Sequence, residues 1–232
     1  MGMYAKDITR FVNRYHLYNI IGYAVEKEYL NTSVTPQDKC YTMEEFYKQF
    51  KPQDNLEVFV AIHQFHNMGS ARQKLYEQLK NSGYKMANII APSANIFTDD
   101  IGDGVFVEEN VHIANNAIIG CNTWILQGAT ICHYTQIGNN SYIGQQAVIL
   151  GNTAIGNNTF VGANATVFNK IRIGEKSVIG AGTTIKRHVP KYCVCKGPTE
   201  SIVVNQYNEQ TIDNKLRPIK FEEVNTYDVV IK

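Results

Sequence analysis

Isoleucine or valine occupies every sixth position of the chain between residues 101 and 185. An α-helix repeats every 3.6 residues and a strand every two, so a period of six is typical of neither and indicates a repeat architecture. β-Branched side chains favour strands, and we expect a short strand at each position with its side chain turned inward. The positions are Ile101, Val107, Ile113, Ile119, Ile125, Ile131, Ile137, Ile143, Ile149, Ile155, Val161, Val167, Ile173, Ile179 and Ile185.

A coarser period of eighteen residues overlies the period of six, so three hexapeptides form one unit. Ile-Gly pairs recur at Ile101-Gly102, Ile119-Gly120, Ile137-Gly138, Ile155-Gly156 and Ile173-Gly174. Segments such as Gly138-Asn139-Asn140 turn the backbone at low cost, which predicts a triangular coil with such residues at its corners. Coils stacked about 4.8 Å apart form a prism with a solid interior.

This pattern, over residues 88–198, resembles the hexapeptide-repeat acyltransferases. The resemblance implies a left-handed parallel β-helix, assembly as a homotrimer, and acyl-CoA bound in the groove between neighbouring prisms. Handedness comes from the resemblance alone, because the general preference for right-handed crossovers argues the other way.

Residues 1–87 follow a different pattern. An amphipathic stretch at 5–15, apolar runs at 19–25 and 58–62, and a helix from Ser70 to about Asn81 predict a small parallel α/β domain. Ser is a suitable cap for that helix, and Gly83 its exit. We therefore expect three segments: the α/β domain at 1–87, the β-helix at 88–190, and a tail at 191–232 that forms short strands or an intersubunit arm.

The order of these segments resembles the bacterial nucleotide-sugar acetyltransferases of the PglD/NeuD type, whose N-terminal Rossmann-like domain binds the nucleotide of the sugar substrate. Residues 2–8 resemble the end of their Gly-rich loop and first helix, Glu26 stands where they carry an acidic residue, and residues 60–63 resemble their domain junction. The resemblance thus implies that Tyr4, Glu26 and His63 contact the nucleotide-linked sugar. No strand precedes residues 2–8, so we expect either a shortened sequence or a smaller sheet.

Composition narrows the function further. A net charge of +1 gives no reason to expect a nucleic-acid partner. No run of eighteen apolar residues predicts a membrane span, and the first residues lack the layout of a secretion signal, which favours the cytoplasm. The five cysteines form no CxxC pair and are expected to be reduced thiols.

Histidine is the natural general base near neutral pH, and of six histidines only His112 and His133 lie inside the repeat. His112 precedes an inward isoleucine and is expected on the surface. Residues 128–133 resemble the segment that carries the family's catalytic histidine, which implies that His133 is the base; the alternative is a solvated corner histidine. Tyr134 stands where the family often has an acidic residue or a second histidine that orients the base.

Gly151 lies eighteen residues after His133, at the same corner one coil further on. The matching family glycine offers its N–H to the thioester carbonyl, so the resemblance implies an oxyanion donor; a simple corner glycine is the alternative.

The small residues Gly162, Ala163, Gly180 and Ala181 and the basic Lys186 resemble the track and phosphate contact along which CoA lies, although small residues also suit corners.

These features predict an acetyl-CoA-dependent acetyltransferase that acts on a nucleotide-linked sugar, with an amino sugar as the first choice. The alternatives are O-acetylation of a sugar hydroxyl and a non-catalytic trimeric scaffold. A carbonic anhydrase of this fold needs three histidines on zinc, whereas the coils hold two, so no metal is expected.

Overall fold

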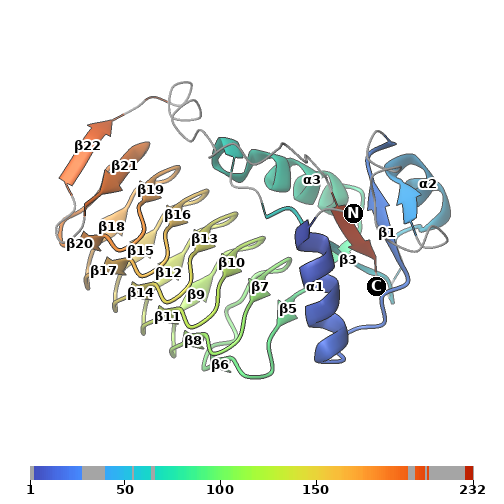
Figure 1. The fold of residues 1–232 in the computed structure, drawn as a ribbon, viewed down its shortest axis with the longest axis horizontal. Coiled ribbons are helices and arrows are strands. Elements are labelled where there is room, and N and C mark those ends of the chain that lie inside the picture. Colours follow the sequence, from blue (N-terminus) through green and yellow to red (C-terminus); the bar gives the residue numbers. More distant parts are fainter. Residues whose placement is uncertain are drawn as a thin grey trace. The chain divides into compact units, whose positions relative to one another are not determined.

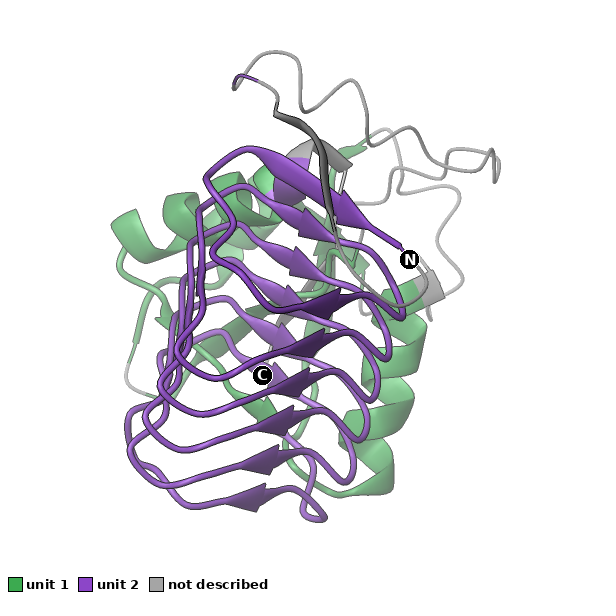
Figure 2. Cartoon of the chain, turned by 90° about the vertical axis from the view of Figure 1, so that its left-hand side faces the viewer, with its two compact units in different colours: residues 1–64, 70–89, 218–232 green, residues 65–69, 90–217 purple. Residues whose placement is uncertain are grey.

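A computed structural model of the chain contains two compact units, which are described separately (Figure 2). The first unit comprises 1–64, 70–89 and 218–232, and the second 65–69 and 90–217. The structure describes residues 3–27, 40–53, 55–63, 66–197, 202–206, 208 and 228–231. Gly2, residues 209–214 and the apolar run 219–221 lie outside these ranges.

The second unit is a triangular parallel β-helix, and its two-residue strands stack coil on coil (Figure 1). Face 1 holds β5 (Ile89–Ile90), β7 (Phe106–Val107), β10 (Trp124–Ile125), β13 (Tyr142–Ile143), β16 (Phe160–Val161), β19 (Val178–Ile179), β21 (Cys193–Lys196) and β22 (Ile202–Gln206). Face 2 holds β6 (Asn95–Ile96), β8 (His112–Ile113), β11 (Thr130–Ile131), β14 (Val148–Ile149), β17 (Thr166–Val167) and β20 (Thr184–Ile185). Face 3 holds β9 (Ile118–Ile119), β12 (Gln136–Ile137), β15 (Ala154–Ile155) and β18 (Arg172–Ile173). We call the corners that follow faces 1, 2 and 3 the first, second and third corner.

The register of the coils confirms the eighteen-residue period. Ile125 pairs in parallel with Ile143, and Ile131 pairs with Ile149. The predicted comb of isoleucine and valine fills the interior, where Ile149 is fully buried. The core continues past the predicted boundary at residue 190, because Cys193 and Cys195 of β21 are buried in it.

The third corner is held by ladders of polar side chains. The Asn122 Nδ2 amide donates to Asn140 Oδ1 of the next coil at 2.8 Å, and both residues have a positive φ, of 54° and 58°. Asparagine tolerates this left-handed conformation better than most residues. The Thr123 hydroxyl donates to the Gly138 carbonyl at 2.9 Å. These bonds satisfy polar groups that the turn would otherwise leave unpaired.

The first unit is built on a five-stranded sheet with the order β2-β1-β23-β3-β4. Its strands are β1 (Gly22–Val25), β2 (Cys40–Thr42), β3 (Glu57–Val60), β4 (Lys85–Met86) and β23 (Asp228–Ile231). Its helices are α1 (Met3–Arg14), α2 (Met43–Gln49) and α3 (Ser70–Asn81), and a 3-10 turn, His66–Gly69, precedes α3 in the chain.

The helices of the first unit follow from local sequence. Helix α1 buries Ala5, Ile8 and Val12, which lie three and four residues apart and so share one face. Helix α3 buries Leu75 and Leu79 as predicted, and Gly83 follows it with a φ of +88°. The helix begins directly after the 3-10 turn, with Ser70 as its first residue.

The prediction of a wholly parallel sheet was wrong. Strands β1 and β2 are parallel, as are β3 and β4, but β23 lies between β1 and β3 and is antiparallel to both. The tail predicted at 191–232 is divided as well, because β21 and β22 extend face 1 while β23 joins the other sheet. Without β23, the backbone N–H and C=O groups along one edge of β1 and one edge of β3 would be unpaired. Strand β23 forms hydrogen bonds with the backbone of both strands.

Candidate active site on the second corner

His133 and Gly151 lie one above the other on the second corner of the prism. His133 follows β11, and Gly151 follows β14 one coil further on. A methyl group built on the Gly151 Cα would lie 2.9 Å from His133 Nε2 and 3.1 Å from Cε1. The imidazole therefore packs directly over the Gly151 backbone, so the structure brings together the predicted base and the predicted oxyanion donor.

The Gly151 N–H has no acceptor within the ranges that the structure describes. On the third corner two of the matching groups are taken, because Cys121 N donates to Asn139 Oδ1 at 2.9 Å and Asn139 N donates to Asn157 Oδ1 at 2.8 Å. Gly151 also carries no side chain to hinder the approach of a ligand. The Gly151 N–H therefore has no acceptor among the described residues and lies next to the imidazole, in a residue that is itself buried.

Tyr134 contacts the His133 ring without orienting it by a hydrogen bond. The two rings meet edge to face with centroids 5.7 Å apart, and the tyrosine is 56% exposed. Tyr134 adopts a φ of 57°, which turns the chain at this corner. Among the described residues no side chain exchanges a hydrogen bond with the imidazole, so packing holds the ring within one chain.

The residues predicted to bind CoA lie on two different corners. Gly162, Ala163, Gly180 and Ala181 follow face-1 strands on the first corner, whereas Lys186 follows β20 on the second corner. The Lys186 ammonium lies 6.0 Å from the centre of the Phe168 ring. Within one prism, face 2 separates the two groups.

Gly162 has a structural reason to be glycine. A Cβ there would lie 2.5 Å from the backbone nitrogen of Ala181 in the next coil. Close stacking of coils therefore explains this glycine without a ligand. Gly151 is different, because the atoms nearest to its added Cβ belong to the His133 side chain.

Two of the three residues predicted to bind the sugar nucleotide are in contact. The Tyr4 ring, on α1, stacks on the His63 ring with centroids 3.6 Å apart and an angle of 7° between the planes. Burial, and secondarily the charge of Arg72, lowers the pKa of His63 to about 3. The imidazole is therefore neutral at physiological pH and can accept or donate hydrogen bonds without carrying charge.

Glu26 lies at the same edge of the sheet as His63. The two residues follow β1 and β3, and these strands run in the same direction because both are antiparallel to β23. Burial, and secondarily the charge of the exposed Glu26 carboxylate, raises the pKa of Tyr47. Its charge therefore acts towards α2, and the sheet edge combines an acidic group with a stacked aromatic pair.

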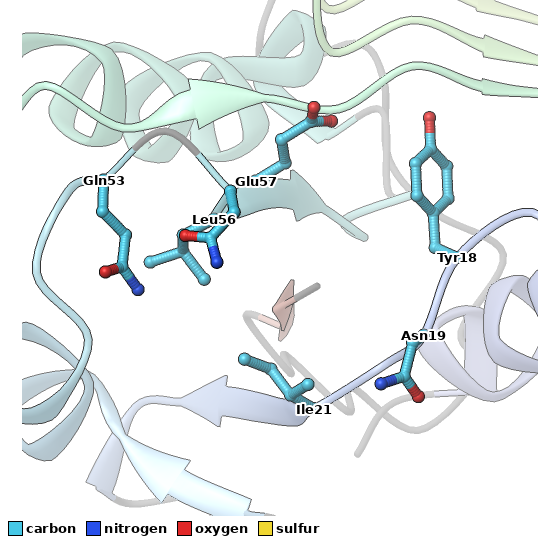
Figure 3. A pocket seen from close by; sticks show the side chains of 7 residues that line it. Tyr18, Asn19, Ile21, Gln53, Leu56 and Glu57 are labelled. Carbon is cyan, nitrogen blue, oxygen red and sulfur yellow. The ribbon is translucent and has the colours of Figure 1, made fainter.

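A pocket of about 350 Å³ at the opposite edge of this sheet was not anticipated from the sequence. Its lining residues are Tyr18, Asn19, Ile21, Gln53, Asn55, Leu56 and Glu57. Figure 3 shows Tyr18 and Asn19 on one side of the space and Gln53 and Leu56 on the other. The Tyr18 hydroxyl donates to the Asn88 carbonyl at 2.7 Å, and burial and the Glu57 charge raise its pKa. No motif marks these residues, which come from the loops before β1 and β3 and from Glu57, the first residue of β3.

Within the described ranges of the chain, no three histidine, cysteine, aspartate or glutamate side chains lie close enough together to hold a metal ion. None of the helices described is long and apolar enough to cross a membrane.

Comparisons with known proteins match the repeat and the fold. Residues 116–151 match the family model "Bacterial transferase hexapeptide (six repeats)", and residues 152–187 match "Hexapeptide repeat of succinyl-transferase". A search of curated protein sequences gave no significant match.

Several solved structures resemble most of the chain. PerB from Caulobacter crescentus, in complex with CoA and GDP-perosamine, is 24% identical with a TM-score of 0.71, over 84% of this chain and 90% of that one. The acetyltransferase domain of PglB from Neisseria gonorrhoeae, in complex with acetyl coenzyme A, is 19% identical with a TM-score of 0.69, over 88% and 95%. WeeI from Acinetobacter baumannii is 19% identical with a TM-score of 0.70, over 84% and 94%.

These matches confirm the predicted left-handed β-helix. Residues 116–187 carry the transferase hexapeptide repeat, and the chain has the left-handed β-helix fold.

Proposed function

We propose that the protein transfers an acetyl group from acetyl-CoA to the amine of a nucleotide-linked amino sugar. The observation that carries this proposal is the His133 imidazole packed over the backbone of Gly151, whose N–H has no acceptor among the described residues. Solved structures of similar fold contain CoA with GDP-perosamine, or acetyl coenzyme A. A base beside a backbone donor is the arrangement that acyl transfer from a thioester requires.

In the proposed reaction the sugar amine attacks the thioester carbonyl carbon of acetyl-CoA. His133 takes the proton that the amine loses as the new C–N bond forms, and the Gly151 N–H stabilises the negative oxygen of the tetrahedral intermediate. The C–S bond then breaks, and the CoA thiolate leaves with the electron pair and takes up a proton. An amine needs less help from the base than a hydroxyl does, which suits an imidazole that no carboxylate of the described residues supports.

We further propose that the CoA site forms between two prisms of a homotrimer. The second corner of one prism, with His133 and Lys186, would face the first corner of its neighbour, with Gly162, Ala163, Gly180 and Ala181. The small residues and Lys186 lie on different corners of one chain, but in this arrangement one extended CoA molecule could contact both. Lys186 would contact a phosphate group, and the small residues would leave room for the pantetheine chain.

The first unit would bind the nucleotide at the sheet edge that carries Tyr4, Glu26 and His63. An acidic residue after a strand can accept hydrogen bonds from ribose hydroxyls, and a half-buried aromatic pair offers a flat surface to a base. The proposed setting is surface-glycan biosynthesis in the cytoplasm, where acetyl-CoA is available.

The substitution His133→Ala tests the proposal. Removal of a general base lowers kcat by about 10²–10⁴-fold, measured as CoA thiol release with nucleotide-linked amino sugars. His112→Ala is the matched control. His112 lies in β8, on the same face of the prism but in the preceding coil, and its ring contacts Phe97 instead of Gly151. Nearly full turnover in His133→Ala would refute the assignment of the base.

Two alternatives are separated by simple measurements. An O-acetyltransferase would also release thiol with acceptors that carry hydroxyls but no free amine, whereas an N-acetyltransferase would not. A trimeric scaffold without catalysis would bind no acetyl-CoA by calorimetry.

A further inference from the structure

The three residues proposed to bind the sugar nucleotide stand on three separate elements. Tyr4 lies on α1, Glu26 directly follows β1, and His63 follows β3. Strands β1 and β3 are not hydrogen-bonded to each other, since β23 occupies the position between them. Something else must therefore fix the distance between these residues.

Strand β23 contacts all three of these elements. It pairs with β1 through four positions, from Gly22↔Ile231 to Val25↔Asp228, and with β3 through three, from Val58↔Ile231 to Val60↔Val229. Helix α1 also packs against β23. The first residue of β23, Asp228, lies at the sheet edge that carries Glu26, because it pairs with Val25, the residue directly before Glu26.

We propose that β23 is the positioning element of the acceptor site, so that a strand from the far end of the sequence controls affinity for the sugar nucleotide. The inference rests on the proposed function of that edge. Backbone pairing on both sides of β23 sets the spacing between β1 and β3, and its packing against α1 keeps Tyr4 stacked on His63. The coils bearing His133 and Gly151 belong to the other unit and should not depend on this strand.

The substitution Val230→Pro tests this role, because Val230 pairs with Tyr23 on one side and Phe59 on the other. Proline removes a ladder hydrogen bond and is poorly tolerated in a central strand. We expect at least a tenfold rise in the Kd for the nucleotide-linked sugar and less than a twofold change in the Kd for acetyl-CoA. Val203→Pro is the matched control, since it places proline in β22, the edge strand of the other unit.

A second readout needs no substrate and separates this inference from the proposed function. The pKa of His63 is about 3 because the ring is buried, so loss of the Tyr4 stack should raise it towards its ordinary value, as measured by NMR titration. In Val203→Pro the titration should match that of the unchanged protein. An unchanged His63 titration in folded Val230→Pro would overturn the positioning role. Failure of the unchanged protein to bind any sugar nucleotide would overturn only the proposed function.

A pair of cysteines tests the register itself, should Val230→Pro fail to fold. Ala24 and Val229 are directly opposite each other, and cross-strand Cα distances of this kind permit a disulfide. Ala24→Cys with Val229→Cys should cross-link under mild oxidation, with a mass loss of about 2 Da. Ala24→Cys with Val230→Cys, one residue out of register, should not. Equal cross-linking of the two pairs, or none in the first, would refute the position of β23.

Discussion

Single glycines at the corners of the prism are constrained by what each would touch if it were larger. Gly151 faces the ring of His133, which is the far end of a side chain, whereas Gly162 faces the backbone nitrogen of Ala181. A side chain can rotate away from an added methyl group, but the backbone of a stacked coil cannot. The two glycines are therefore required for different reasons, one by the imidazole packed over it and one by the stacking of coils.

The paired substitutions Gly151→Ala and Gly162→Ala separate these purposes. Gly151→Ala should displace the imidazole and lower kcat by about tenfold or more, since small misplacements of a catalytic group are costly. Its free energy of unfolding should change by less than about 1 kcal/mol. Gly162→Ala should instead lower that free energy by about 1–3 kcal/mol through overpacking. Urea unfolding and steady-state kinetics on both variants provide the check, and equal loss of stability in the two would contradict the distinction.

His63 makes the first unit sensitive to acid. Its pKa is about 3 in the folded chain, below the ordinary value of 6.5, so the unfolded chain binds more protons between these two pH values. Stability should therefore decline as the pH falls from about 6.5 towards 3. His63→Phe keeps an aromatic ring beside Tyr4 but cannot be protonated, and its urea midpoint should fall less between pH 7 and pH 4.5. An identical decline in both proteins would show that other groups cause the loss.

At the scale of the element, each short strand places one side chain inside the prism and the next one outside. Ile119 is 1% exposed and belongs to the core, while its neighbour Ile118 is 44% exposed. The two residues occupy the same strand, β9, and differ only in the side of the sheet that they face.

Truncation of these neighbours should therefore have very different effects. Ile119→Ala leaves a cavity in the core and should cost about 2–5 kcal/mol of unfolding free energy. Ile118→Ala, on the surface, should cost less than about 0.5 kcal/mol. Urea denaturation followed by circular dichroism measures both. Similar costs would mean that face 3 does not have the exposure described here, for example because a partner covers it.

The strands of the prism could be predicted from sequence because each one repeats the same local rule, an inward β-branched residue every six positions. The same rule placed Gly151 over His133, eighteen residues apart. Short strands were expected in the tail, but the pairing of β23 could not be found in this way, since its partners β1 and β3 lie about 205 and about 170 residues earlier in the chain. Short-range patterns carry no information about such a pairing. The stack of Tyr4 on His63 likewise depends on where the sheet brings two distant segments.

Helix α2 was missed although a local signal was present. The Thr42 hydroxyl accepts from the Glu45 N–H at 3.1 Å, and Glu45 accepts from the Thr42 N–H at 2.8 Å. This reciprocal capping box is visible in the sequence as Thr followed three residues later by Glu. The helix is only seven residues long, which is too short for its apolar period to show.

At the scale of the whole molecule, the proposed CoA site requires two chains. His133 and Gly151 stand on the second corner, and Ala163 and Gly162 stand on the first corner of the same prism. In a cyclic trimer each site would combine the second corner of one subunit with the first corner of the next.

Subunit mixing tests this arrangement. His133→Ala and Ala163→Trp should each be inactive alone, but trimers reassembled from equal amounts should recover about a quarter of full activity, because each site draws its two corners independently. A mixture of His133→Ala with Gly151→Trp should recover none, since both changes lie on the same corner. Recovery in the second mixture, or none in the first, would exclude a site shared in this way. Thiol release after refolding from denaturant measures the outcome.

Because paired strands from β7 to β20 are eighteen residues apart, the height of the prism is set by the number of coils. Each insertion of one such period lengthens the axis by a single strand spacing, about 4.8 Å, and leaves every other coil in register. Duplication or loss of one coil in the gene would therefore change the height of the prism in fixed steps, while the residues at the corners of every remaining coil keep their places.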